Sequence, residues 1–316
     1  MKKLFAILCM AALLLSMTAC QGAKDDTIKV GVCQLTPHVA LDAATEGFVE
    51  TLKAEFGDKI EIDVQVGGGD TATCSPIVNA FVSDGVDLIM ANATPALQAA
   101  AAATTDIPIL GTSVTEYGVA LDIQNFTGVV GGNISGTSDL APLDQQAAMV
   151  KEWFPDAKNV GLLYCSGEAN SQYQVDTVQA ELEALGFTCK QYPFADSNDM
   201  QAITQKAADE SDVIYVPTDN TLASATGIVD GICRPMGIPV IAGEEGACSG
   251  CGVATLSISY YDLGVTTGKM AAKILTGEAD ISTMEIAYAD NFTKKFNEEI
   301  CNDLGLTAPA DYVAIG

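Results

Sequence analysis

Residues 87–100, DLIMANATPALQAA, decide the fold, because a short apolar run, a polar turn and an alanine-rich helical stretch follow one another. Residues 212–225, DVIYVPTDNTLASA, repeat that order, and IPILGTS at 107–113 is matched by IPVIAGE at 238–244. Apolar runs of this length that lead into helical stretches are typical of buried parallel strands with crossover helices. Two copies at corresponding places indicate a duplicated chain.

The same alternation continues on both sides of these stretches and predicts an α/β fold of two doubly wound, Rossmann-like lobes. In the first half we expect strands at 28–32, 60–66, 87–90 and 107–110, and helices at 41–56, 74–82 and 95–103. In the second half we expect strands at 160–164, 188–192, 212–216 and 238–241, and helices at 172–185, 200–208 and 222–233.

The chain is expected to cross between the lobes three times, near residues 136, 255 and 285. The stretch 253–258 and the helical stretch 262–275 are too short for a third lobe, so we expect them to return to the first. Three crossing strands make a hinge. The predicted N-terminal lobe is 28–136 plus 256–285, and the predicted C-terminal lobe is 137–255 plus 286–316.

The first twenty residues resemble a bacterial export signal that ends in a lipidated cysteine. Two lysines precede an apolar run at 4–15 that is too short to span a bilayer, and small residues then lead into Cys20. We expect residues 1–19 to be a signal peptide and 20–27 a tether, with Cys20 acylated on the extracytoplasmic face of the cell membrane. The alternative is ordinary signal cleavage near Ala19.

Charge and composition exclude several functions. The chain has 41 acidic and 15 basic side chains and a formal net charge of −26, so its surface repels nucleic acid. Arginine occurs once, at Arg234, and histidine once, at His38. We therefore expect no phosphate site built on arginine, no catalytic zinc, no Ser-His-Asp triad and no cofactor. His38 has two interpretations, as a core or capping residue and as a residue of a ligand cleft.

The cysteines leave three interpretations open. Of ten cysteines, Cys9 lies in the predicted signal and Cys20 at its end, which leaves eight in the exported chain. An even number outside the cell favours disulfides, whereas a chain of this size can also hold buried free thiols. Cys248 and Cys251 have CxxC spacing in a glycine-rich stretch, where the alternatives are a local disulfide, unpaired thiols and a metal or redox site.

A ligand cleft is expected where the carboxyl ends of the strands of the two lobes face each other. Thr94-Pro95 has the pattern of an N-cap followed by proline, and Thr218 to Asn220 stands at the matching place of the second lobe. Helix starts suit a carboxylate and Asp219 suits an ammonium, which favours an α-amino acid; ordinary caps and turns are the alternative. The residues that follow strands are Gln34, Asp70, Asn92, Ala93, Thr94, Thr112, Ser113, Cys165, Ser166, Thr218, Asp219, Asn220, Glu244 and Glu245.

Several stretches resemble one family, the ABC-transporter substrate-binding proteins associated with tryptophan, phenylalanine and tyrosine uptake. They are PHVALDAATEGFVETL (37–52), DLIMANATPALQAAAAAT (87–104), IPILGTSVTE (107–116), SGEANS (166–171), IYVPTDNTLASA (214–225) and SISYYDLGVTTGKMAAKILTG (257–277). The resemblance implies a type I periplasmic-binding fold, joined by a three-strand hinge, that closes around an amino acid. It further implies a monomer that delivers this ligand to an ABC permease driven by an ATPase.

The resemblance also implies roles at the cleft, with Asp219 at the ligand ammonium and His38, Pro95 and Tyr260 beside the ligand side chain. Together with the strand-end argument, the expected ligand-binding residues are Gln34, His38, Thr94, Pro95, Ser113, Thr115, Asn170, Ser171, Thr218, Asp219, Asn220, Glu245 and Tyr260.

The chain departs from that family near the expected cleft rim. Cys165-Ser166 stands where family members usually have Asn-Pro, ACSGCG at 247–252 is unusual, and a third glycine precedes Asp70. A different small solute is therefore an alternative to an aromatic amino acid. A lipid-anchored receptor that senses a ligand is a second alternative, and an exported enzyme is a third, although the sequence shows no catalytic constellation.

Overall fold

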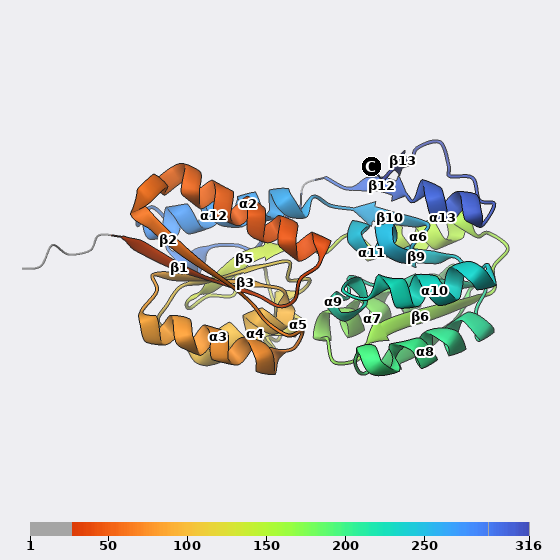
Figure 1. Cartoon of the computed structure of the whole chain (residues 1–316), viewed down its shortest axis with the longest axis horizontal. Helices are drawn as coiled ribbons and strands as arrows, with labels where there is room; N and C mark the ends of the chain where they lie inside the picture. The colour runs from red at the N-terminus through yellow and green to blue at the C-terminus, as the bar shows by residue number, and fades with distance from the viewer. Residues whose placement is uncertain (1–26, 290, 316) are drawn as a thin grey trace, which may run out of the picture.

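The computed structural model describes residues 27–289 and 291–315, which form two lobes lying end to end (Figure 1). The predicted signal peptide at 1–19 and the predicted lipid anchor at Cys20 lie outside these described residues. Over the described ranges, no helix is both long enough and apolar enough to cross a membrane.

The first lobe is a parallel sheet covered by helices on both faces. Its strand order is β11-β5-β4-β3-β1-β2, and α2 and α12 cover one face while α3 and α4 cover the other (Figure 1). The strands are β1 (Ile28–Gln34), β2 (Ile60–Val66), β3 (Leu88–Asn92), β4 (Ile109–Thr112), β5 (Ile134–Ser138) and β11 (Ala287–Tyr288). The helices are α2 (Val39–Phe56), α3 (Thr71–Asp84), α4 (Thr94–Ala103), α5 (Tyr117–Ala120) and α12 (Tyr260–Leu275), with 3₁₀ turns η1 (Gly57–Lys59) and η2 (Ile281–Thr283).

The second lobe has the strand order β13-β12-β10-β9-β8-β6-β7, in which only the pairing of β10 with β12 is antiparallel among the described strands. The strands are β6 (Asn159–Cys165), β7 (Thr188–Phe194), β8 (Val213–Val216), β9 (Val240–Ala242), β10 (Ala254–Ser257), β12 (Thr293–Phe296) and β13 (Val313–Ala314). The helices are α6 (Leu143–Trp153), α7 (Ala169–Ala184), α8 (Ser197–Glu210), α9 (Asn220–Ala223), α10 (Thr226–Met236), α11 (Glu245–Cys251) and α13 (Glu298–Asp303).

The two sheets share one topology, so the duplication predicted from the sequence is confirmed. In space, β2-β1-β3-β4-β5 of the first sheet corresponds to β7-β6-β8-β9-β10 of the second. One predicted helix differs, because 222–233 is divided into the short α9 and the longer α10. This break follows the N-cap residue Asp219 by one turn, at the edge of the cleft described below.

The sheets show where the chain passes from one lobe to the other. β5 remains in the first sheet through Ser138, β10 remains in the second through Ser257, and β11 pairs with β5 through Ala287 and Tyr288. Each passage therefore lies slightly further along the chain than 136, 255 and 285.

Helix α12 is held against α2 by two glycines, which fixes the helix start that faces the second lobe. A Cβ on Gly47 of α2 would lie 2.2 Å from the carbonyl oxygen of Tyr261. A Cβ on Gly264 of α12 would lie 2.0 Å from the carbonyl oxygen of Ala44. Because any larger residue would force the helices apart, this packing places Tyr260 at the interface between the lobes.

Candidate ligand-binding cleft

A cavity of about 560 Å³ lies between the carboxyl ends of the two sheets. Its first-lobe wall includes Asp70, which caps α3, and Pro95 in the first turn of α4. Its second-lobe wall includes Cys165 at the end of β6 and Glu168 at the N-cap of α7. This is the place at which ligands bind in open α/β sheets, and the volume suits a small molecule.

Two hydrogen bonds close the lobes around this region. His38 Nε2, at the start of α2, lies 3.2 Å from Asn220 Oδ1 of α9, 182 residues away in the sequence. Tyr260 Oη, at the start of α12, donates to Asp139 Oδ2 at 2.9 Å, on the passage that follows β5. The first bond joins lobe to lobe, and the second joins the first lobe to the hinge.

Buried polar atoms without a hydrogen-bond partner are concentrated at the same interface. Within the described residues nine such side-chain atoms occur, and six of them belong to residues at the carboxyl ends of strands or at helix starts. Because each unsatisfied buried atom costs about 1–3 kcal/mol, such a concentration is typical of a site that binds a polar ligand. The six are His38 Nδ1, Asn92 Oδ1, Thr94 Oγ1, Ser113 Oγ, Asp139 Oδ1 and Asn170 Oδ1.

The first lobe adopts strained backbone conformations where β3 and β4 end. Ala93 has φ of 93° and Ser113 has φ of 52°, both in the region that favours glycine. Such conformations cost about 1–3 kcal/mol each and cluster at functional sites. Ala93 rather than the predicted Thr94 is the N-cap of α4, and Thr94 is its first helical residue. At these turns the Thr94 and Ser113 side chains are 2% and 5% exposed, and Pro95, the neighbour of Thr94, lines the cavity.

The second lobe has a hydrogen-bond network centred on Glu168, which the strand-end argument did not single out. Its carboxylate accepts bonds from Asn220 N at 3.1 Å and Asn220 Nδ2 at 2.6 Å, and from Thr221 N and Oγ1 at 2.8 Å each. It also accepts from Asn170 Nδ2 at 3.2 Å. The free N–H groups at the start of α9 are therefore satisfied by the protein itself, and this helix start is not the carboxylate site that the sequence predicted.

Asp219 is the N-cap of α9, as the capping alternative proposed. Its Oδ2 accepts from Cys165 N at 2.6 Å and its Oδ1 accepts from Leu222 N at 2.9 Å. Burial and the neighbouring charge of Glu168 raise the pKa of Asp219 to about 7. Both oxygens thus hold protein backbone, so in this geometry Asp219 links the ends of β6 and β8 and positions Asn220.

Asp139 is a buried acid, and its Oδ1 has no hydrogen-bond partner among the described residues. Burial raises its pKa, although the hydroxyls of Tyr260 and Thr115 partly oppose that rise. Glu244 caps α11 nearby, and burial raises its pKa to about 7 with a smaller contribution from the charge of Asp139. With Glu168 and Asp219, these acids give the interface an excess of buried carboxylates.

No lysine or arginine in the described part of the chain forms an ion pair with Asp139, Glu168, Asp219 or Glu244. Burial lowers the pKa of His38, so its imidazole is neutral at pH 7 and does not offset the acids. An environment of this kind favours a positively charged group and disfavours an anionic ligand.

The other expected residues divide into two sets. Ser171, Thr115 and Thr218 lie at the interface, where Thr115 O accepts from Ser138 Oγ at 2.7 Å and Thr218 O accepts from Asn170 Nδ2 at 3.0 Å. Gln34 and Glu245 have other partners. Gln34 donates to Asp42 Oδ1 at 2.6 Å and accepts from Thr45 Oγ1 at 2.7 Å, within the first lobe.

Glu245 pairs with Lys295 Nζ at 2.7 Å and lines a second cavity of about 530 Å³ on the α2–α11 side of the molecule. Tyr260 borders that cavity with its ring while its hydroxyl reaches Asp139. We therefore do not place Gln34 or Glu245 at the ligand.

The CxxC cysteines are unpaired thiols in this structure, and they lie on a helix rather than in a loop. Cys248 and Cys251 belong to α11 and are 0% and 3% exposed, and Cys251 Sγ donates to Ala247 O at 3.3 Å. Among the described residues, no group of cysteines, histidines and acids is arranged to hold a metal. Burial raises the pKa of both thiols well above the usual value, which makes them poor nucleophiles.

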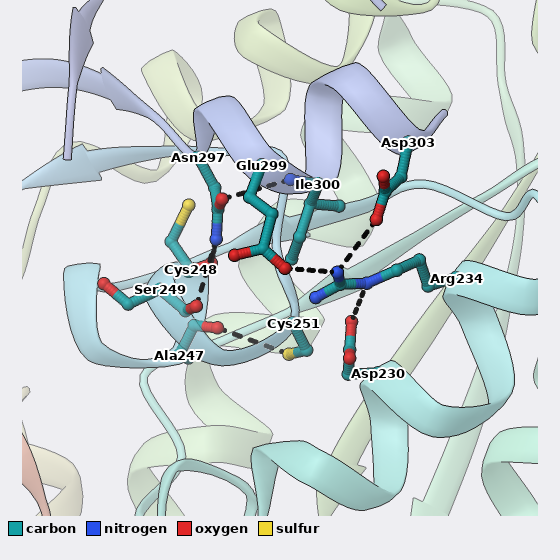
Figure 2. Close-up of polar contacts among 10 residues, drawn as sticks. All are labelled: Asp230, Arg234, Ala247, Cys248, Ser249, Cys251, Asn297, Glu299, Ile300 and Asp303. Atoms are coloured by element: carbon teal, nitrogen blue, oxygen red, sulfur yellow. Dashed lines mark hydrogen bonds and ion pairs between the residues drawn. The ribbon is translucent and has the colours of Figure 1, made fainter. Parts of the chain in front are cut away.

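Helix α11 is held in place by the C-terminal segment (Figure 2). Asn297 Nδ2 donates to Cys248 O at 3.2 Å and to Ser249 O at 3.0 Å. Arg234 of α10 pairs with Asp230 on its own helix and with two acids of α13, Glu299 at 2.8 Å and Asp303 at 3.0 Å. The CxxC pair therefore lies on a helix that contacts from α13 hold in place within the second lobe.

A two-lobed α/β protein with a buried polar interface at its strand ends has the architecture of a protein that binds a small molecule between its lobes. Residues 29–314 match the family described as ABC transporter substrate binding protein, and the chain belongs to that family. Its members bind small molecules outside the cytoplasm for transporters rather than catalyse a reaction. A tyrosine-binding protein of Clostridioides difficile is 34% identical over 295 residues, which are 90% of this chain and 84% of that protein.

Two solved structures resemble this chain over about nine tenths of its length. A Streptococcus pneumoniae ABC domain in complex with L-Trp is 31% identical with a TM-score of 0.85, over 90% of this chain and 96% of that one. A ligand-free, open substrate-binding protein of Clostridium difficile is 38% identical, yet its TM-score is 0.69 over 92% of this chain and 100% of that one. The open, ligand-free protein is the more similar of the two in sequence, but it superposes on this structure less well than the L-Trp complex does. This difference agrees with lobes that are closed in the present structure.

Proposed function

We propose that this protein is the lipid-anchored capture subunit of an ABC importer for an aromatic amino acid. The relative named as tyrosine-binding and the structural neighbour that contains L-Trp support the ligand class. The buried polar atoms at the interface and the excess of buried carboxylates support a ligand that carries an ammonium group.

The ammonium is proposed to lie between Asp139 Oδ1 and Asn170 Oδ1. Asn170 Nδ2 is surrounded by three acceptors, Glu168 Oε2, Ser171 Oγ and Thr218 O, so the remaining Oδ1 can only accept. Because Asp139 lies on the hinge and Asn170 on the second lobe, one ammonium bound to both oxygens stabilises the closed form. Asp219 then acts by positioning Asn220 and the end of β6, not by contact.

The ligand carboxylate is proposed to bind Thr94 Oγ1 and Ser113 Oγ, two buried hydroxyls of the first lobe that can donate. Thr94 is the first residue of α4, a ten-residue helix whose positive dipole end favours an anion. Pro95 in the same turn borders the cavity, where the ligand side chain is proposed to lie.

The exported and anchored state is proposed from the sequence at 1–20. The small residues that lead into Cys20 support cleavage after residue 19 and acylation of Cys20 on the outer face of the membrane. Capture of the ligand closes the lobes, and a partner permease with its ATPase then recognises the closed form. Metabolic labelling of the cells with an alkyne-tagged palmitate tests the anchor, since Cys20→Ser removes the label.

The observation that carries the proposal is that Asp139 Oδ1 and Asn170 Oδ1 are both buried without a hydrogen-bond partner among the described residues. Calorimetric titration of the refolded mature protein with tyrosine, tryptophan, phenylalanine, leucine and a neutral sugar tests it. We expect one-to-one binding of aromatic amino acids and no binding of the sugar. An absence of binding by every amino acid contradicts the proposal and leaves the departures at 165–166 and 247–252 as the places that define another solute.

A further inference from the structure

His38 has one ring nitrogen whose role the closed lobes do not explain. It stands at the N-cap position of α2, but its side chain caps no helix N–H. Its Nε2 contacts Asn220 Oδ1 at 3.2 Å, whereas its Nδ1 is buried with no hydrogen-bond partner among residues 27–289 and 291–315.

The network around Asn220 determines which nitrogen of His38 carries the proton. Asn220 Nδ2 donates to Glu168 Oε2 at 2.6 Å, so Asn220 Oδ1 is the atom that faces His38 and accepts. His38 Nε2 must therefore donate, and in a neutral imidazole Nδ1 then presents a lone pair. A buried lone pair of this kind requires a donor, and donors with a polar hydrogen occur on tyrosine and tryptophan side chains.

His38 lies next to the wall of the cavity between the lobes. Its partner Asn220 donates to Glu168 Oε2, and Glu168 and Thr221 line that cavity. The unpartnered Nδ1 therefore belongs to a residue at the edge of the proposed ligand site.

We propose that His38 Nδ1 accepts a hydrogen bond from the phenol hydroxyl of the ligand and makes the site selective for a hydroxylated aromatic ring. This inference rests on the proposed function and specifies its substrate. With phenylalanine in the cleft, Nδ1 stays buried and unpaired, and that penalty corresponds to a loss of affinity of about 10- to 100-fold. His38 is thus a specificity-determining residue, in addition to joining the lobes through Nε2.

The two roles of His38 can be separated with a matched pair of variants. In the wild-type protein we expect tyrosine to bind about 10- to 100-fold more tightly than phenylalanine. His38→Phe removes both nitrogens, so we expect weaker binding of both ligands and a tyrosine-to-phenylalanine affinity ratio close to one. Asn220→Asp keeps an oxygen that accepts from His38 Nε2 and so keeps Nδ1 unprotonated, so we expect the tyrosine-to-phenylalanine ratio to persist in this variant even if both ligands bind more weakly.

A measurement on the unmodified protein avoids any effect of the variants on folding. Because His38 is the single histidine of the chain, ¹⁵N-labelled histidine in a tag-free mature protein gives one imidazole without assignment. We expect an unprotonated Nδ1 resonance that moves upfield with tyrosine and does not move with phenylalanine. An Nδ1 that is protonated, or that responds equally to both ligands, overturns the inference.

The outcomes distinguish this inference from the proposed function. If no aromatic amino acid binds, the proposed function fails. If tyrosine and phenylalanine both bind with equal affinity, or if the ratio persists in His38→Phe, the function stands and the role of His38 is wrong.

Discussion

The two lobes share one duplicated topology, yet the polar side chains at their cleft edges differ in how many hydrogen-bond partners they have. At the edge of the first lobe, Thr94 and Ser113 are buried without partners next to strained backbone. At the edge of the second lobe, both carboxylate oxygens of Glu168 and of Asp219 accept hydrogen bonds from the protein. We infer that the first lobe supplies most of the groups that only a ligand satisfies, and that the second lobe, apart from Asn170 Oδ1, supplies a rigid frame.

From this difference between the lobes, we expect Glu168 to matter more for stability than the unpartnered residues of the first lobe do. In Glu168→Gln, an amide NH₂ replaces an oxygen that faces the donors of Asn220 and Thr221, so two donors oppose each other in a buried place. We expect a loss of about 3 kcal/mol in the free energy of unfolding, and a lower melting temperature by about 5–10 °C. Thermal unfolding of ligand-free protein by circular dichroism measures both, and an unchanged melting temperature contradicts the rigid-frame interpretation.

The hinge residue Asp139 is expected to matter for binding instead. Asp139→Asn keeps the size of the side chain but removes the charge that is proposed to hold the ammonium, so we expect affinity for tyrosine to fall about 100-fold. Because the change also removes a buried acid whose pKa is raised, we expect no loss of stability. Asp144→Asn, in the exposed first turn of α6, is the control for calorimetry and should bind normally.

Much of the fold could be predicted because buried parallel strands are visible as apolar runs. β3 and β8 contain such runs, and their repeat establishes both sheets. β11, with two residues, and β12, with the sequence TKKF, have no such pattern and were not predicted. Their place depends on pairing with distant strands, through Ala287↔Thr137 and Ala254↔Phe296.

The sequence predicts where strand ends bring polar residues together, but not the roles of the acids there. The strand-end argument named Thr94, Ser113 and Asp219, because it depends only on where strands end, and their contact with a ligand stays a prediction. It missed Asp139, since ISGTS of β5 is buried but too polar to be recognised as a strand. Whether the oxygens of an acid are occupied depends on tertiary contacts, and no spacing in the sequence reveals that Asp219 is a cap while Asp139 keeps a free oxygen.

The first-lobe edge can be tested by removing one unpartnered hydroxyl. Thr94→Val has the same shape without the oxygen, so we expect affinity for tyrosine to fall about 10-fold. Since that oxygen has no partner among the described residues, we also expect stability to be unchanged or higher by up to about 1 kcal/mol. Thr204→Val is the matched control, a buried unpartnered threonine on α8 that should bind normally. Loss of stability in Thr94→Val alone would mean that the hydroxyl serves the fold.

The smallest expected effect is a pair of opposite pH trends. Burial raises the pKa of Asp219 and Glu244 to about 7, whereas unfolded acids titrate near pH 4. Between about pH 4 and 7 the folded protein therefore binds more protons than the unfolded chain, so its stability falls as pH rises and is level above that range. Without ligand, we expect the melting temperature to be lower at pH 8 than at pH 5, and the difference to be smaller in Glu244→Gln.

Affinity should change with pH in the other direction, because the ligand ammonium favours the ionised form of Asp139, whose pKa burial raises. Binding of tyrosine then releases protons at pH values where Asp139 is partly protonated, and the affinity increases as pH rises, by about 2- to 5-fold. Calorimetry in two buffers with different heats of ionisation measures this release directly. If affinity and ligand-free stability rise together with pH, the acids at the interface serve only the frame, and the division of roles between the two edges is wrong.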